Sequence, residues 1–411
     1  MAKIVPFKAV RPSREKVGLV PSRPFQEYSV EEVKFQLEHN PFSFLHIINP
    51  GYKFQKEISG SERFQLVRNR YLEFKEEGIF IRDEKPAYYI YKTISRNETY
   101  CGIIAATSVA DYENDVIRKH EDTISQREKL FKDYLDTVGF NTEPVLLTYP
   151  DNEVINSITA QVMSQRAEYE FTSLNRDTHY LWVVDGEELT GQIRAEFEKM
   201  KAVYIADGHH RSASSWLLAK ESAKKNPNHT GEEPYNFFLS YMIAESNLKL
   251  YEFNRLVRDL NGLSKKEFLM QLDEWFRIEN RGGKLYKPSK KHHFSMYLDK
   301  EFYSLYLRKT RYEFTDSLSA LDPYILFIKI LKPLLGIEDL KNDLRISYLP
   351  GGNQTFEVKK AVDEGHYAVG FGMLSLTTDE VKQIADEGLT MPPKSTCIEP
   401  KLRSGLTVYE F

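Results

Sequence analysis

Five consecutive residues near the middle of the sequence combine a carboxylate, a glycine, two imidazoles and a guanidinium: Asp207, Gly208, His209, His210 and Arg211. Arg211 offers a planar fork of donors that matches phosphate oxygens, and Asp207 can bind Mg²⁺ or accept a proton. The two histidines can donate hydrogen bonds to a transferred group or move protons. The alternative is that Asp207 caps a helix and the histidines pack beside it, and the spacing alone leaves both open.

The elements around this run are the ones that an anion site needs. Residues 201–206 predict a short buried strand, and the Ala- and Leu-containing stretch after Arg211 predicts a helix. The first amides of a helix lack partners within it and lie at its positive end, while Gly208 lets the backbone approach a ligand closely. We therefore expect a phosphate group to bind at this strand-to-helix turn.

A second group of titratable residues lies at 116–123, before a helix expected at about 126–138. His120, Glu121 and Thr123 are its candidate contacts to a substrate or metal. The segment is not a zinc-protease motif, because Ile124 occupies the position of the second histidine. A solvated charged face is the alternative interpretation.

The C-terminal segment, residues 391–406, is rich in basic and hydroxyl side chains and contains three prolines. Its candidate phosphate or donor contacts are Lys394, Ser395, Thr396, Lys401, Arg403 and Ser404. A basic, solvated tail is the alternative.

The run Asp-Gly-His-His-Arg resembles the phosphate-binding motif of the ParB/sulfiredoxin superfamily, which includes nucleotide-using enzymes and kinases of free serine. From residues 5–7 to 404–406 the chain also resembles the domain of unknown function 1015 family, including the His-Glu-x-Thr segment and the tail. This resemblance implies that the tail folds back toward Asp207 and supplies Lys394, Lys401 and Arg403 to an anionic ligand. One departure is Gln26-Glu27 after Phe25, where that family usually has an aspartate. Glu27 is either a substitute base or an exposed glutamate. Arg23, in the stiff loop 21–25, is a further candidate substrate contact.

Composition limits the possible functions. The 411 residues are 41% hydrophobic and 28% charged, which is typical of a globular protein with one to three cores. A net charge of -4 without a basic run argues against nucleic acid or a membrane surface as partner. No signal peptide or apolar run of about 20 residues is present, so we expect a cytosolic protein, with Cys101 and Cys397 reduced.

The periodicity predicts an α+β fold with mixed sheets and flanking helices, with a boundary near residue 260. The resemblance implies that 1–260 form a ParB/sulfiredoxin-like core and that 261–411 form a C-terminal region. Expected strands are 4–10, 40–47, 87–94, 99–108, 143–149, 179–184, 201–206, 236–244, 250–257, 292–298, 302–307, 345–349 and 367–373. Expected helices are 30–37, 61–77, 126–138, 152–165, 188–200, the stretch after residue 211, one from about 261, and 321–335. His46, in an expected strand, is left outside the active set.

The resemblance implies a phosphotransferase acting on a small hydroxylated metabolite, most plausibly free L-serine or phosphoserine. Gly208 and Arg211 would hold the phosphoryl group, Glu121 or Asp207 would act as base or Mg²⁺ ligand, and His209 or His210 would stabilise transferred charge. The donor is ATP, ADP or pyrophosphate, and no Walker A loop is present to choose among them. A phosphohydrolase and a nucleotide-binding or DNA-partitioning protein are the alternatives, and the oligomeric state is open.

Overall fold

The computed structural model describes residues 1–95, 98–351 and 355–411, which form two compact units. Unit 1 contains residues 1–119, 123–248 and 400–411. Unit 2 contains residues 249–399 together with 120–122. The main crossing from unit 1 to unit 2 lies at Leu248–Lys249, against an expected boundary near residue 260, and the last twelve residues return to unit 1. The assignment of catalysis to the N-terminal region stays a prediction.

Within the described residues, unit 1 is built on a nine-stranded mixed sheet with the order β6-β11-β8-β12-β5-β4-β10-β9, and β1 pairs with β5. β8 runs parallel to β12 and antiparallel to β11. The strands are β1 (Ile4–Val5), β4 (Tyr88–Ser95), β5 (Glu98–Ser108), β6 (Ile117–Arg118), β8 (Val145–Tyr149), β9 (Tyr169–Thr172), β10 (Thr178–Val184), β11 (Val203–Asp207) and β12 (Phe237–Ala244). Their long runs of buried residues suit a sheet that is covered on its faces.

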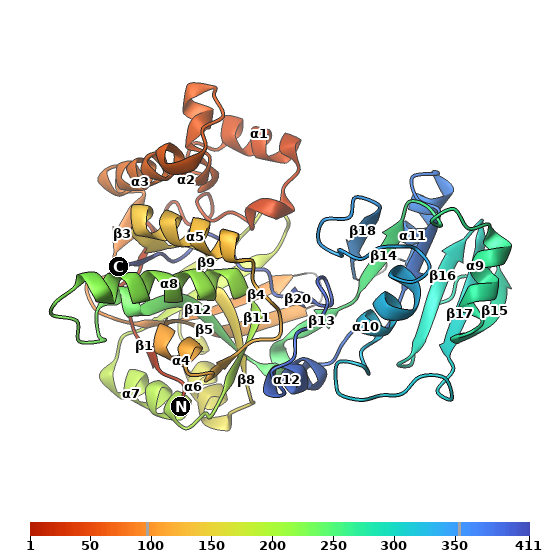
Figure 1. Cartoon of the computed structure of the whole chain (residues 1–411). Helices are drawn as coiled ribbons and strands as arrows, with labels where there is room; N and C mark the ends of the chain where they lie inside the picture. The colour runs from red at the N-terminus through yellow and green to blue at the C-terminus, as the bar shows by residue number, and fades with distance from the viewer. Residues whose placement is uncertain (96–97, 352–354) are drawn as a thin grey trace. The chain divides into compact units, whose positions relative to one another are not determined.

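Helices α4 (Val109–Glu113), α6 (Glu153–Met163), α7 (Glu187–Glu198) and α8 (His209–Lys225) contribute side chains to the same core as this sheet. Helix α5 (Ser125–Val138) runs beside α8 (Figure 1). Lys132 of α5 joins the two helices through an ion pair of 2.8 Å to Glu221. This ion pair lies toward the C-terminal end of α8, whereas the predicted site begins at the first turn of the helix.

A second core of unit 1 gathers residues of α2 (Leu45–Ile48), α3 (Gly60–Glu76) and the end of α5, together with Val408, which precedes the C-terminal strand β21 (Tyr409–Glu410). The remaining elements here are β2 (Val10–Pro12), β3 (Phe80–Arg82), β7 (Phe140–Asn141), α1 (Val30–His39) and 3-10 helices at Phe25–Glu27, Pro50–Phe54, Pro234–Asn236 and Glu245–Asn247. β21 pairs with β7, and Val408 exchanges hydrogen bonds with Val10. The tail is therefore part of the unit 1 body.

The strand predicted at 40–47 is wrong, because its apolar residues form the short helix α2. Phe44, Leu45 and Ile47 are all fully buried, which is the pattern of a helical turn within a core rather than of an alternating strand. The His46 ring makes a 3.1 Å hydrogen bond to the Asn40 carbonyl, and burial lowers the pKa of His46. His46 is thus a hydrogen-bonded histidine, as expected.

Among the described residues, unit 2 has a six-stranded antiparallel sheet with the order β15-β17-β16-β19-β14-β18. Its strands are β14 (Phe253–Val257), β15 (Phe276–Gly282), β16 (His293–Leu298), β17 (Glu301–Leu307), β18 (Ile346–Pro350) and β19 (Val369–Gly372). Its helices are α9 (Lys265–Leu272), α10 (Asp322–Leu326), α11 (Thr355–Asp363) and α12 (Thr378–Asp386), and β13 (Lys249–Tyr251) pairs with β20 (Cys397–Glu399). The helix predicted at 321–335 is shorter, since α10 passes into a π-helical turn at Phe327–Leu331.

The α+β class is confirmed. The predicted hairpin is present as β4 and β5, and two residues of its turn, 96 and 97, lie outside the described residues. In the described part of the chain, no helix is both long and apolar enough to cross a bilayer.

Candidate functional site

The predicted strand-to-helix turn is formed by β11 and α8. Val203 to Ala206 are buried in the sheet, and Gly208 precedes the first residue of α8 with φ 106° and ψ 30°. A Cβ atom at this position would lie 3.0 Å from the Arg211 Nε atom. Both the positive φ and the close guanidinium therefore require glycine here.

Arg211 is anchored on three sides. Its guanidinium donates to Asp207 Oδ2 at 2.9 Å and to the Pro144 carbonyl at 2.7 Å, and it forms an ion pair of 2.7 Å with Glu143. Two carboxylates thus surround one cation. The group as a whole carries a net charge of about -1, so a bare phosphate gains little from Arg211 alone.

A cavity of about 180 Å³ opens beside Arg211, entirely within unit 1. Aromatic rings line part of it, among them Phe25, Phe131 and Tyr134. Its polar lining residues are Asn141, Thr142, Glu143, Arg211, Ser214, Ser215 and Ser404. A small apolar chamber with a few polar groups on its wall is typical of a metabolite site.

The tail completes this cavity. Ser404 exchanges two backbone hydrogen bonds with Ser22, at 2.9 and 3.1 Å, and the Gly405 amide donates to the Thr142 carbonyl at 3.2 Å. Of the predicted residues, the structure therefore brings Arg211 and Ser404 to one cavity. Their roles toward a ligand stay predictions.

The other residues of the central run differ in exposure. Asp207 exposes 45% of its side chain, His209 is buried, and His210 is half-buried with its ring 6.4 Å from the Phe131 ring. Phe131 lines the cavity. Asp207 and His210 are therefore more exposed than His209, although neither lines the cavity.

Arg403 has a set of contacts of its own. Its Nε donates to His179 Nε2 at 3.0 Å, and an NH group lies 3.8 Å from the Asp177 carboxylate. The Tyr91 hydroxyl lies 2.8 Å from the other ring nitrogen of His179. Burial, and then the charge of Arg403, lower the pKa of His179 to about 3. Arg403 thus ties the tail to β10 of the sheet.

Four further candidates of unit 1 do not line this cavity. Arg23 pairs with Glu32 at 2.9 Å and stacks on the Tyr28 ring, and Thr123 donates a hydrogen bond to Glu128. Lys401 is half-buried. Glu27, the possible substitute base, is exposed.

The remaining candidates belong to unit 2. His120 is buried and its carbonyl accepts from the Met391 amide at 3.0 Å, while Glu121 is exposed. Lys394 is exposed, Ser395 is buried and donates to the Pro392 carbonyl at 2.6 Å, and Thr396 is half-buried. The candidate residues of the tail therefore lie in two units. Residues 394–396 belong to unit 2, and residues 401–404 belong to unit 1.

Comparison with known proteins places the chain in a family. A model for "Protein of unknown function (DUF1015)" matches residues 4–324. The chain belongs to the DUF1015 family. No curated protein sequence matches it.

Three solved structures resemble this DUF1015 chain. Free serine kinase in complex with AMP has 12% identity and a TM-score of 0.34, covering 76% of this chain and 94% of that one. SbnI with C-terminal truncation from Staphylococcus aureus has 13% identity and a TM-score of 0.39, covering 74% and 85%. A conserved hypothetical protein from Pyrococcus furiosus has 12% identity and a TM-score of 0.36, covering 76% and 98%. The TM-scores lie below 0.5, so nothing about the reaction of this chain follows from them.

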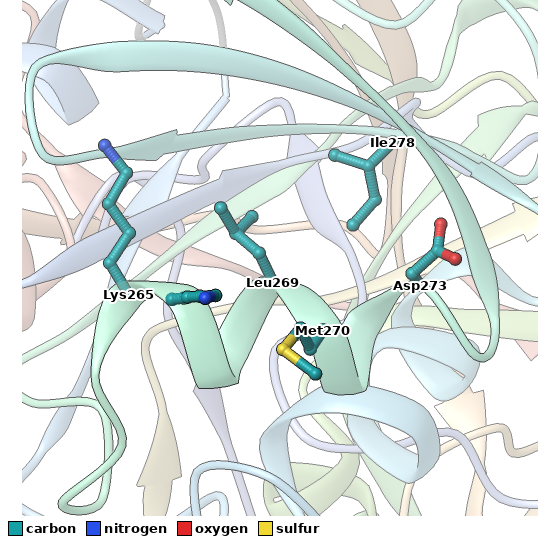
Figure 2. Close-up of a pocket in the computed structure, with 6 residues that line it drawn as sticks. Lys265, Leu269, Met270, Asp273 and Ile278 are labelled. Atoms are coloured by element: carbon teal, nitrogen blue, oxygen red, sulfur yellow. The ribbon is translucent and has the colours of Figure 1, made fainter.

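A second hollow, of about 800 Å³, lies along α9 in unit 2 (Figure 2). Leu269 and Met270 of the helix and Ile278 of β15 form its apolar part. Two of its charged residues form ion pairs at the surface: Lys265 with Glu301 and Asp273 with Arg308, each at 2.8 Å. None of the predicted site residues lines this hollow, and we do not assign chemistry to it.

The predicted metal site is incomplete as a protein-only cage. No group of three His, Cys, Asp or Glu side chains is placed to hold a metal ion in the described ranges. Asp207 and Glu143 still provide carboxylate oxygens around one guanidinium. Mg²⁺ is commonly held by one or two carboxylates together with substrate phosphates. Asp207 and Glu143 fit a site of this shared kind, not one made of protein ligands alone.

Glu143 is the principal residue that the sequence prediction missed. It lies 68 positions before Arg211 and reaches the cavity because β8, which follows it, is the neighbour of β11. Ser214 and Ser215 were missed as well, although they follow Arg211 by one turn of the predicted helix. That spacing was a readable signal, since residues three and four apart share a helix face.

Proposed function

We propose that this DUF1015 protein is a phosphotransferase that acts on a small hydroxylated metabolite, with free L-serine as the first substrate to test. The observation that carries the proposal is the cavity at the first turn of α8, where Arg211, Glu143 and serine hydroxyls line one small chamber. The turn places the positive end of a 17-residue helix at this point.

The size of the chamber favours a small substrate. Its volume of about 180 Å³ is below the range of roughly 300–1,000 Å³ that is usual for larger ligands. A three-carbon metabolite suits this space better than a whole nucleotide does. The base and ribose of a nucleotide donor would then lie outside it.

The charges of the chamber favour an amino acid. Arg211 matches a carboxylate, Glu143 matches an ammonium group, and the two already lie 2.7 Å apart. The hydroxyls of Ser215 and Ser404 are available to position a substrate hydroxyl. Serine carries all three groups, whereas a simple hydroxy acid lacks the ammonium.

The transfer step requires one base and neutralised phosphates. The substrate hydroxyl oxygen attacks the terminal phosphorus of ATP, ADP or pyrophosphate, and the bond from that phosphorus to the leaving phosphate group breaks. The hydroxyl proton passes to a carboxylate, for which Asp207 and Glu143 are the candidates beside Arg211. Glu121, the other carboxylate that the sequence suggested as a base, lies in unit 2. Mg²⁺, if bound at Asp207, would neutralise the donor's phosphate oxygens.

Phosphorus NMR tests the proposal. Purified protein is mixed with Mg²⁺ and serine, and ATP, ADP and pyrophosphate are offered in separate tubes. We expect phosphoserine with one donor, and we expect its formation to be lost in Arg211→Ala. Arg127→Ala, which changes an exposed arginine of α5, is the matched control and should remain active.

The other outcomes are equally informative. Free phosphate released from phosphoserine without an acceptor would replace the proposal with a phosphohydrolase. No new phosphorus signal in any tube would reject serine as the substrate. A melting temperature close to that of the parent protein is required of Arg211→Ala, since this residue also joins Asp207 to Glu143.

A further inference from the structure

Unit 2 contains a buried cation that lacks a counter-charge. Arg255, in the central part of β14, is only 2% exposed. No carboxylate pairs with it in the described part of unit 2, whereas the buried Arg11 of unit 1 pairs with Asp83 at 2.8 Å and with Glu168 at 3.1 Å. Burying a charge without an opposite one is costly, so the fold keeps Arg255 at the expense of stability.

The donors of Arg255 reach toward the C-terminal segment. They bind the Phe253 carbonyl, the Met373 sulfur at 3.3 Å and the Lys394 carbonyl at 3.0 Å. The guanidinium also lies 5.6 Å from the Tyr348 ring. Burial lowers the pKa of Arg255 to about 10, so the group is still a cation at neutral pH.

The segment that Arg255 holds is a strained turn. Lys394 has a φ of 59°, a left-handed conformation that is unfavourable for a residue with a side chain. Pro393 precedes it, and the Ser395 hydroxyl closes the turn on the Pro392 carbonyl. The hydrogen bond from Arg255 to the Lys394 carbonyl supports this conformation directly.

The direction of one peptide unit gives the turn its chemistry. In a trans peptide the C=O and the following N–H point opposite ways. Since the Lys394 carbonyl points toward Arg255, the Ser395 amide points away from it. The Lys394 ammonium is exposed and lies 5.6 Å from the Phe253 ring. Ser395 itself is buried, so an anion at this turn meets the exposed Lys394 ammonium in the field of the Arg255 guanidinium.

We propose that residues 392–396 form an anion subsite for a phosphate group, and that Arg255 is the positioning residue that holds it. Lys394 is the contact residue, and Arg255 acts through the Lys394 carbonyl. The proposal deepens the proposed function, on which it rests for the choice of phosphate as ligand. The phosphate could belong to a nucleotide or to free pyrophosphate, and separate titrations distinguish these two sources.

The test is calorimetric titration of the full chain with pyrophosphate and, separately, with ADP. Lys394→Gly suits the left-handed position and removes the ammonium, so we expect it to melt no lower than the parent protein and to bind at least about tenfold more weakly. Arg255→Met should weaken binding in the same way, and Arg255→Lys should restore part of it. Lys309→Gln, another exposed lysine of unit 2, is the control and should bind normally.

The readouts separate positioning from general stability. A merely structural Arg255 would lower the melting temperature and leave the affinity of the folded protein unchanged. Parent-like affinity in Lys394→Gly and in the folded Arg255 variants would overturn the subsite, even if phosphoserine forms. No binding of either ligand to the parent protein would overturn it too. Loss of binding in the variants without any phosphoryl transfer by the parent would keep the subsite and reject the proposed function.

Discussion

His179 provides a prediction that needs no knowledge of the substrate. Arg403 can only donate hydrogen bonds, so His179 Nε2 must be the acceptor of their 3.0 Å bond, and the neutral ring carries its proton on Nδ1. Nδ1 lies 2.8 Å from the Tyr91 hydroxyl. Protonating Nε2 would break the bond to Arg403 and place two cations in contact. The pKa of His179, lowered to about 3 by burial and by Arg403, reflects that cost.

The sign and size of the effect follow from linkage. The unfolded chain takes up a proton on this ring below about pH 6.5, whereas the folded chain does so only near pH 3. The stability contributed by neutral His179 is therefore fully present above pH 6.5 and is lost as the pH falls. Between about pH 7 and about pH 5 the loss from this one group is about 1.9 kcal/mol. The figure changes little if the folded pKa is one unit higher, because pH 5 is still above it.

Urea unfolding of the parent protein and of His179→Gln at the two pH values measures this difference. Glutamine keeps an acceptor for Arg403 and a donor for Tyr91 but does not titrate. The unfolding free energy of the parent should fall by about 1.9 kcal/mol more than that of the variant, in the transition that reports on unit 1. Equal pH dependence in the two proteins would refute the reasoning. So would a His179 ring resonance that titrates above pH 5 in the folded protein.

Three other changes have defined outcomes. Gly208→Ala should destabilise unit 1 by about 1–3 kcal/mol in urea unfolding, because the φ of Gly208 is 106°. Gly191→Ala is the control. This glycine lies within α7, no atom lies near its Cβ position, and its replacement should be neutral or stabilising. Glu143→Gln should raise the KM for serine about tenfold or more with the KM for the donor unchanged, and an unchanged serine KM would exclude Glu143 as the ammonium contact. Burial raises the pKa of Asp322 to about 7. The unfolding free energy of unit 2 should therefore fall by about 1.4 kcal/mol as the pH rises from about 6 to about 8. Asp322→Asn should remove this fall in the same unfolding assay.

The sequence was most informative where local pattern and burial agree. β11 and α8 were expected because an apolar run precedes a glycine and a helix-forming stretch, and both are present. Helix α12 was missed although Thr377 and Glu380 form a capping box, a pattern that can be read from sequence. The strand predicted at 40–47 failed for the opposite reason. A short apolar run fits a buried strand and a buried helical turn equally well, and only the tertiary packing of Phe44 and Ile47 decides between them.

The candidate site shows the same division between local and non-local information. Arg211 was identified from its neighbours in sequence, which also form its helix turn. Glu143 could not be identified in this way, because it approaches Arg211 only when β8 is placed next to β11 in the sheet. Ser404 was expected beside the turn, and it lines the same cavity as Arg211. Lys394 was expected there as well. It belongs to unit 2, and its place beside the turn stays a prediction.

Three arginines show what sequence cannot supply about an anion site. Arg211, Arg255 and Arg403 are equal in formal charge, yet the first faces two carboxylates, the second only neutral acceptors, and the third a neutral imidazole with Asp177 at 3.8 Å. The attraction left for an incoming phosphate depends on these partners more than on the arginine itself. On this argument Arg211, already neutralised, suits a zwitterionic substrate or a phosphate whose charge a cation shares. Arg255, which no carboxylate pairs with in the described part of unit 2, generates the stronger field for a bare phosphate group. It acts on that group through the turn at Lys394, whose conformation it supports.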